Sequence, residues 1–150
     1  NGKKLTTENV NKLTNLAENH NVSELIDHCL AKNKQKIINI LNENNFNNED
    51  CIIIVRTFLN KAKQLLNLSK NYYKNKNMEL VISTAKPPIF WKNKDITIQQ
   101  IYKWNPNSLR GLLIELNTLE LVIKKNINSS ISLVFDFIFE HTNSKTNNYP

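Results

Sequence analysis

Apolar residues recur three or four positions apart along almost the whole of this 150-residue chain. The longest such run, residues 49–74, keeps this spacing over about seven turns, which is far longer than an ordinary strand. The only glycines are Gly2 and Gly111, so the tight turns that β-hairpins favour have few places to form. The sequence therefore predicts an all-α protein with seven or eight helices.

Residues that begin or stop helices divide this periodicity into segments. Asn105 stands where a cap is needed and Pro106 follows at the first helical position, while Pro87 and Pro88 end the segment before them. Besides the long run, we expect helices over 6–19, 21–33, 34–44, 78–85, 89–104 and 105–126, and a last one that starts at Ser129 or Ser130.

A polar stretch at 45–48 interrupts the pattern and predicts a boundary between two parts. Residues 1–45 then form a small helical piece, residues 46–143 a larger bundle, and residues 144–150 a frayed tail. The last helix contains ISLVFDFIFEH, which is apolar nearly all round. Such a helix is either central in the fold or covered by a partner.

The positive charge of this chain is concentrated in its middle third. The net charge is +7, and residues 51–103 hold ten basic residues against two acidic ones, whereas residues 1–50 hold six against seven. Lysine outnumbers arginine 18 to 2, and Lys, Asn and Ile share AT-rich codons, so we attribute part of this excess to genome bias. A basic stretch attracts nucleic acid, although bidentate phosphate contacts favour arginine.

Six aromatic residues lie in or beside that basic stretch, among lysines. Rings that stack, with lysines that neutralise phosphates, are a common means of binding single-stranded nucleic acid. The other interpretation places most rings in the core, since Trp104 follows Ile101 by three positions and Tyr73 continues the apolar face of the long helix. We expect the core arrangement and keep a nucleic-acid-binding domain centred on 51–103 as the alternative. The residues concerned are Tyr72, Tyr73, Phe90, Trp91, Tyr102 and Trp104, with Lys70, Lys74, Lys76, Lys92, Lys94 and Lys103 among them.

The chain shows no constellation of residues typical of an enzyme. His28 and Cys29 are neighbours that point to different sides of a helix, so they do not form a metal pair. Cys29 and Cys51 stand among apolar residues and are expected to be buried, reduced thiols. We expect no catalytic residue, metal or cofactor. An enzyme would instead be indicated by Glu115 or Glu120 in a deep pocket with a raised pKa.

The order of several segments resembles a known family. A helix opening LTTENV precedes VSELIDHCLAKNKQKIINILNEN, and a long helix ending FLNKAKQLLNLSK precedes KPPIFWKNK, IYKW and LNTLELVIKKN. This order is similar to the C-terminal part of the delta subunit of bacterial DNA polymerase III, the clamp-opening subunit of the clamp loader. Over residues 4–140 the match rests on ELIDHCL at 24–30, IINILNEN at 37–44, the KPPIFWK connection, and the helix with Leu109, Leu116, Leu119, Glu120 and Lys124.

This resemblance implies a fold, partners and site residues. Residues 1–45 would be the remainder of a helical lid domain, and 46–143 an orthogonal or up-down helical collar bundle that assembles the loader. The partners would be the gamma/tau and delta prime subunits. The sliding clamp would be bound only through an N-terminal domain absent from this sequence, and primer–template DNA only indirectly. Polymerase (nucleotidyltransferase) activity would reside in other subunits. A partner interface is expected at Leu113, Leu116, Leu133, Phe135, Phe137 and Phe139.

The resemblance also gives KPPIFWKNK a role as a joint between two helices. The prolines would fix the turn, the rings of Phe90 and Trp91 would anchor the next helix in the core, and the lysines would face outward. The structural signature is then Pro87, Pro88, Phe90, Trp91, Trp104 and Pro106. The chain has no run of about 18 apolar residues that a membrane span needs, and nothing in it suggests export, so we expect a cytoplasmic bacterial protein.

Overall fold

The computed structural model describes the backbone of residues 7–143 and the side chains of residues 19–143. Within this part of the chain there are seven α-helices and no strand, so the prediction of an all-α fold is confirmed. The expected tail at 144–150 lies outside the described residues. The helices are α1 (Thr7–Ala31), α2 (Lys34–Glu43), α3 (Cys51–Asn75), α4 (Met78–Ser83), α5 (Lys94–Lys103), α6 (Pro106–Lys125) and α7 (Ser130–Asn143), with 3-10 turns at Asn48–Asp50, Trp91–Asn93 and Ile127–Ser129.

The helix α1 combines two segments that the sequence analysis separated. The expected break near residue 20 is wrong, because neither proline nor glycine stands there to stop the helix. The helix ends at Lys32, whose left-handed φ of 58° lets the Asn33 amide donate to the His28 carbonyl at 3.0 Å. This is the hydrogen bond that closes many helix ends, here with lysine where glycine is usual.

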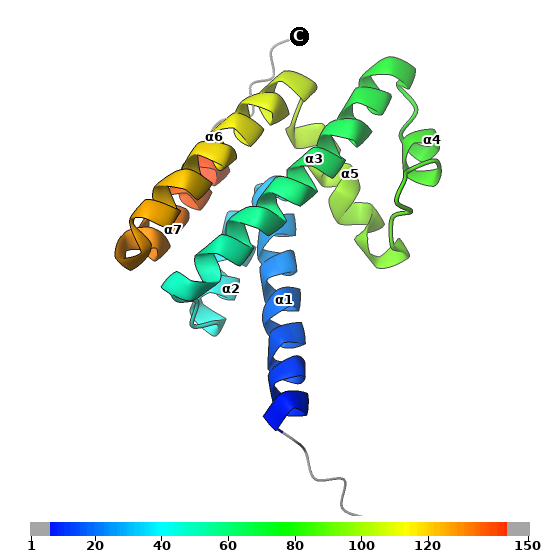
Figure 1. Cartoon of the computed structure of the whole chain (residues 1–150). Helices are drawn as coiled ribbons and strands as arrows, with labels where there is room; N and C mark the ends of the chain where they lie inside the picture. The colour runs from blue at the N-terminus through cyan, green and yellow to red at the C-terminus, as the bar shows by residue number, and fades with distance from the viewer. Residues whose placement is uncertain (1–6, 144–150) are drawn as a thin grey trace, which may run out of the picture.

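The central element is α3, which packs along α6 and also contacts α1, α4, α5 and α7 (Figure 1). Its inward face carries Val55, Phe58, Ala62 and Leu65, which are buried at the helical spacing that the sequence predicted. One hydrophobic cluster runs from Val22 to Ile138 and includes residues on both sides of the expected boundary near 45. The division into residues 1–45 and 46–143 stays a prediction.

Helix α6 begins as expected. The Asn105 side chain accepts from the Ser108 amide at 2.7 Å, the Ser108 hydroxyl accepts from the Asn105 amide at 3.0 Å, and Pro106 is the first helical residue. This reciprocal pair satisfies amides that have no partner within the helix. Leu109, Leu112, Leu116, Leu119 and Ile123 form its buried stripe.

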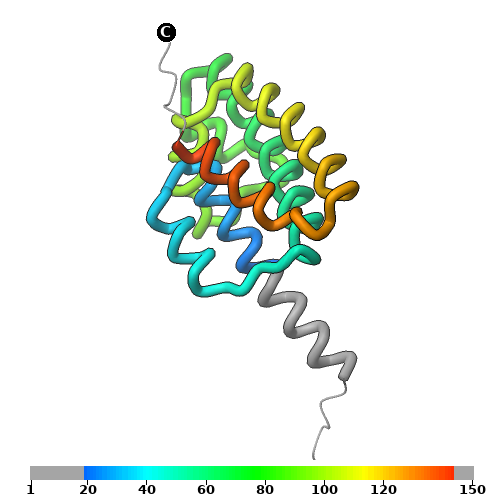
Figure 2. The backbone as a smooth tube through the Cα atoms, turned by 90° about the vertical axis from the view of Figure 1, so that its left-hand side faces the viewer, coloured from blue at the N-terminus to red at the C-terminus, as the bar shows by residue number. Residues whose placement is uncertain are grey.

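Helix α7 lies at the surface, so a central position is excluded. Figure 2 shows it crossing one side of the molecule between α6 and α2, and its buried residues include Val134 and Ile138. The Glu115 carboxylate and the His141 ring, 2.7 Å apart, join α6 to α7. Whether a partner covers the rest of the helix stays a prediction.

Candidate interaction surfaces

The segment KPPIFWKNK connects two helices, but its rings do not enter the core. Phe90 is 56% exposed and Trp91 is 74% exposed. Pro87 and Pro88 are also exposed, and Ile89 is the half-buried residue of the segment. The expectation that Phe90 and Trp91 anchor the next helix in the core is therefore wrong for this chain.

The local backbone explains where these rings point. The prolines exclude a helix, and the Asn93 amide donates to the Phe90 carbonyl at 2.8 Å in a single 3-10 turn. Regular α-helix starts only at Lys94, five residues later than predicted, so the rings lie outside the helical register of α5. The inward face of α5 comes instead from Thr97, Gln100 and Ile101.

Trp104 is the aromatic residue that does anchor α5. It is 5% exposed, and its indole Nε1 donates to the Leu30 carbonyl at 2.7 Å. The Lys32 ammonium lies 4.5 Å above the ring, and burial lowers the pKa of that ammonium. The prediction of a core position for Trp104 is confirmed, and its role is to join the end of α1 to the end of α5.

An apolar patch on the outer side of α6 was not predicted. It consists of Ile114, Leu121 and Val122, with Ile127 in the turn that follows, and we call it the α6 apolar surface. Ile114 is 67% and Leu121 62% exposed. The two lie seven residues apart, hence on one face of the helix. They could have been found in the sequence as the apolar residues left over from the inward stripe.

The six residues expected at a partner interface fall on other faces. Leu116 is fully buried, so it has no surface to offer a partner, and that assignment is corrected here. The other five are half-buried and pack against the core. They are Leu113, Leu133, Phe135, Phe137 and Phe139. Phe137 makes an edge contact with Phe58 in which the ring centroids are 6.0 Å apart.

A small charged network joins α3 to α6. Glu120 accepts from Arg56 Nε at 3.1 Å, and Lys124 Nζ lies 3.4 Å from the same carboxylate oxygen. The hydrogen bond from Arg56 lowers the pKa of the Glu120 carboxyl. A general acid would need a raised pKa, so Glu120 does not meet the condition that would have indicated an enzyme.

Three tyrosines cluster where the end of α3 meets the end of α5. Tyr72 makes edge contacts with Tyr73 and with Tyr102, at centroid distances of 6.0 and 5.8 Å. Tyr102 is 61% exposed, and the Lys76 ammonium lies 4.6 Å above the Tyr73 ring. We call these residues the tyrosine cluster. The expected burial of Tyr73 is wrong, because Tyr72 continues the inward face after Ser69.

The five lysines considered for nucleic-acid contact are exposed and fall into two groups. Lys70, Lys74 and Lys103 belong to the helix ends that carry the tyrosine cluster, whereas Lys92 and Lys94 lie at the other end of α5. A ten-residue helix spans about 15 Å. The fold therefore does not place all five around one centre.

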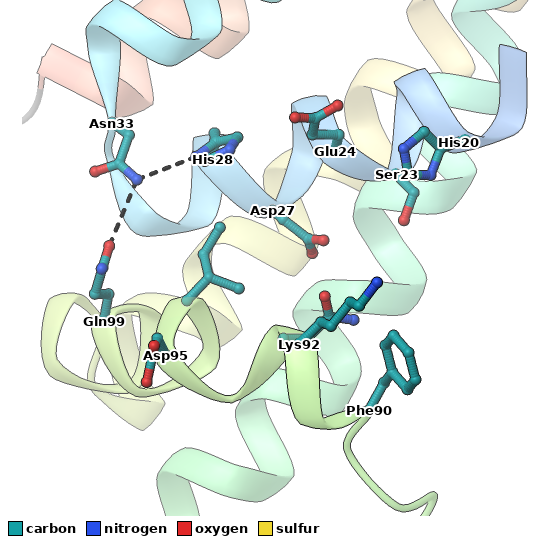
Figure 3. Close-up of a pocket in the computed structure, with 12 residues that line it drawn as sticks. His20, Ser23, Glu24, Asp27, His28, Asn33, Phe90, Lys92, Asp95 and Gln99 are labelled. Carbon is teal, nitrogen blue, oxygen red and sulfur yellow. Dashed lines mark hydrogen bonds between the residues drawn. The ribbon is translucent and has the colours of Figure 1, made fainter. Parts of the chain in front are cut away.

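A pocket of about 570 Å³ lies between α1 and α5 (Figure 3). From α1 it is lined by Glu24, Asp27 and His28, among others, and from the other side by Phe90 and Lys92. The Asn33 amide nitrogen lies 3.1 Å from His28 Nδ1 and donates to the Gln99 side-chain oxygen at 3.5 Å. Burial lowers the pKa of the His28 imidazole.

The contacts at this pocket bind helices to each other. Asp27 accepts from Lys61 on α3 at 2.8 Å, and its carbonyl accepts from the Gln100 side chain on α5 at 2.8 Å. Among the side chains at 19–143, no three His, Cys, Asp or Glu residues lie close enough together to hold a metal ion. The expected lack of a metal, cofactor and catalytic residue stays a prediction.

The two cysteines are buried and free, as predicted. Burial raises the pKa of both thiols, so neither is a reactive thiolate. None of the described helices combines the length and the apolar character that crossing a bilayer requires. No protein-family model, curated protein or solved structure matches the chain.

Proposed function

We propose that this chain is a non-catalytic assembly module of a bacterial clamp loader, the lid remainder and collar of a DNA polymerase III delta subunit. The observation that carries an assembly role is the α6 apolar surface. Exposed apolar residues that share one helix face mark sites of protein association. Here they stand on a helix that is fixed by a capping box and by a buried leucine stripe.

The resemblance in segment order decides which assembly is proposed. In it, the region around α6 belongs to the collar that packs beside the collars of the other loader subunits. Rigid placement of the exposed residues lowers the entropy cost of docking, since the backbone is already ordered. The partners are then the gamma/tau and delta prime subunits, and DNA is reached through the assembled loader.

Co-purification tests this function. The chain is immobilised and mixed with the gamma/tau and delta prime subunits of the same organism, at low and at high salt. Capture that persists at high salt is expected, because apolar contacts are not screened by ions. Failure to capture either subunit at both salt concentrations would contradict the proposal.

A second candidate function rests on the tyrosine cluster. Tyr102 and Tyr73 present ring surface next to Lys76, and Lys74 and Lys103 lie beside them in the sequence. Base stacking on such rings is worth about 1–3 kcal/mol per base. We infer that a single-stranded nucleic acid is the ligand that this surface would take.

A salt titration separates the two functions. Binding of a fluorescent thymidine oligonucleotide should weaken steeply as salt rises. The Tyr102→Ala variant should bind it less tightly, whereas Phe90→Ala, which removes an exposed ring elsewhere, should not. An affinity that is independent of salt, or equal in the two variants, would remove this candidate.

A further inference from the structure

A second apolar hollow lies between α4 and the chain that follows it. Leu80 and Ile82 line it from α4, and Pro88, Ile89 and Trp91 line it from the connection to α5. Its volume is about 640 Å³, and Lys94 and Glu79 also line it. None of these residues belongs to the α6 apolar surface or to the tyrosine cluster.

The walls of this groove include large apolar side chains that the fold leaves in water. Trp91 is the most exposed large hydrophobic residue of the described part, and Leu80 is also exposed. Its ring touches Phe90, at a centroid distance of 5.8 Å, and lies under the Lys92 ammonium, at 5.4 Å. Tryptophan beside a pocket is the kind of residue that dominates binding energy at protein interfaces.

The charge around the groove is strongly positive. Residues 74–94 hold five lysines and one acidic residue, Glu79. Lys94 lines the groove itself and Lys92 lies over the Trp91 ring, so two of these ammonium groups are next to the apolar walls. A ligand with carboxylates on either side of an apolar group would meet both features.

We propose that this groove binds an acidic peptide segment of a partner protein, with one large apolar side chain inserted beside Trp91 and Leu80. The flanking carboxylates of that segment pair with Lys92 and Lys94. A peptide is favoured over nucleic acid because four of the walls are aliphatic or proline side chains, and because the Glu79 carboxylate lies where a phosphate would be repelled. This site is independent of the assembly role, since it uses none of the same residues.

The intrinsic fluorescence of the whole chain gives a direct test. Of the two tryptophans, Trp104 is buried and Trp91 is exposed, so a ligand that covers the groove shifts the emission of Trp91. The probes are synthetic peptides in which Phe, Leu or Trp stands between Asp and Glu residues. The comparison probes carry Lys in place of the acids, and a thymidine oligonucleotide tests for nucleic acid.

The acidic peptides should blue-shift the emission and the lysine peptides should not. By a labelled-peptide assay, Trp91→Ala and Lys94→Glu should each weaken binding by about tenfold. The matched controls Tyr102→Ala and Lys63→Glu, which change an exposed ring and an exposed lysine outside the groove, should bind like the unaltered chain. Leu80→Ser gives a second test of the apolar wall without changing an aromatic residue.

Three results would overturn the proposal. The first is that no acidic peptide changes the Trp91 emission at millimolar concentration. The second is that peptide affinity is the same in Trp91→Ala, Leu80→Ser and the control variants, which would place the binding elsewhere. The third is that the oligonucleotide shifts the emission and the peptides do not, which would make the groove a nucleic-acid site.

Discussion

Trp104 joins three helices by hydrogen bonds at both its indole and its backbone. Its Nε1 donates to the Leu30 carbonyl at the end of α1, and its own carbonyl accepts from the Ser69 hydroxyl of α3 at 3.3 Å. Its position could be predicted because it follows Ile101 at helical spacing. The exposure of Trp91 could not, because a 3-10 turn shifts the register and no pattern in the sequence marks that shift.

The two tryptophans therefore predict opposite effects of the same substitution. Trp104→Phe removes the donor to Leu30 and leaves a buried carbonyl without its partner, which should lower the free energy of unfolding by about 1–3 kcal/mol. Trp91→Phe alters an exposed ring and should change it by less than about 0.5 kcal/mol. Urea unfolding of both variants checks this, and equal effects would contradict the assigned positions.

His28 predicts a dependence of stability on pH. Burial holds its pKa in the folded chain below the ordinary value of 6.5. As pH falls through that value, the unfolded chain takes up more protons than the folded one, so the free energy of unfolding decreases. His28→Gln should flatten this slope, measured by urea unfolding between neutral pH and pH about 5.

The matched control for this slope is His20→Gln, a change at an exposed histidine of the same helix. It should leave the pH dependence of the unaltered chain in place. A slope that persists in His28→Gln and disappears in His20→Gln would assign the effect to the wrong residue in this account.

At the scale of helices, caps and periodicity explain most of the agreement between sequence and structure. The start of α6 at Pro106 follows from Asn105, and the inward faces of α3 and α6 follow from their leucine and isoleucine spacing. The long α1 was missed because a run of polar residues near 20 was interpreted as a break, although such residues tolerate a helix. The late start of α5 was missed because the prolines extend the chain beyond themselves.

The capping box of α6 gives a prediction at this scale. Asn105→Ala removes the acceptor for the Ser108 amide and should destabilise the chain by about 1 kcal/mol. Asn107→Ala alters an exposed residue of the same helix, whose side chain accepts only from Arg110 among the hydrogen bonds found here, and should cost less than about 0.5 kcal/mol. Thermal or urea unfolding compares the two, and an equal loss would argue against the cap.

For the whole molecule, the sequence was sufficient for the fold class and insufficient for the surface. Inward stripes repeat and can be recognised, whereas the outward position of Ile114 and Leu121 depends on which faces the other helices cover. The interface expected on α7 illustrates this, because Phe135, Phe137 and Phe139 looked unpartnered in the sequence and are half-buried against the core.

The α6 apolar surface predicts that assembly and folding can be separated. Ile114→Ser combined with Leu121→Ser changes two exposed side chains and should alter the free energy of unfolding by less than about 1 kcal/mol. The same double variant should weaken association with the clamp-loader partners by at least about tenfold, because it removes the apolar contact area. Lys36→Ser, an exposed change on α2, is the control for both measurements.

The most direct measurement is the dissociation constant between this chain and the gamma/tau and delta prime subunits, determined by calorimetry at low and high salt. The account predicts binding that persists at high salt, is weakened at least about tenfold by the Ile114→Ser and Leu121→Ser double variant, and is unchanged by Lys36→Ser. Equal affinity of the double variant and the unaltered chain, or no binding at either salt concentration, would contradict it.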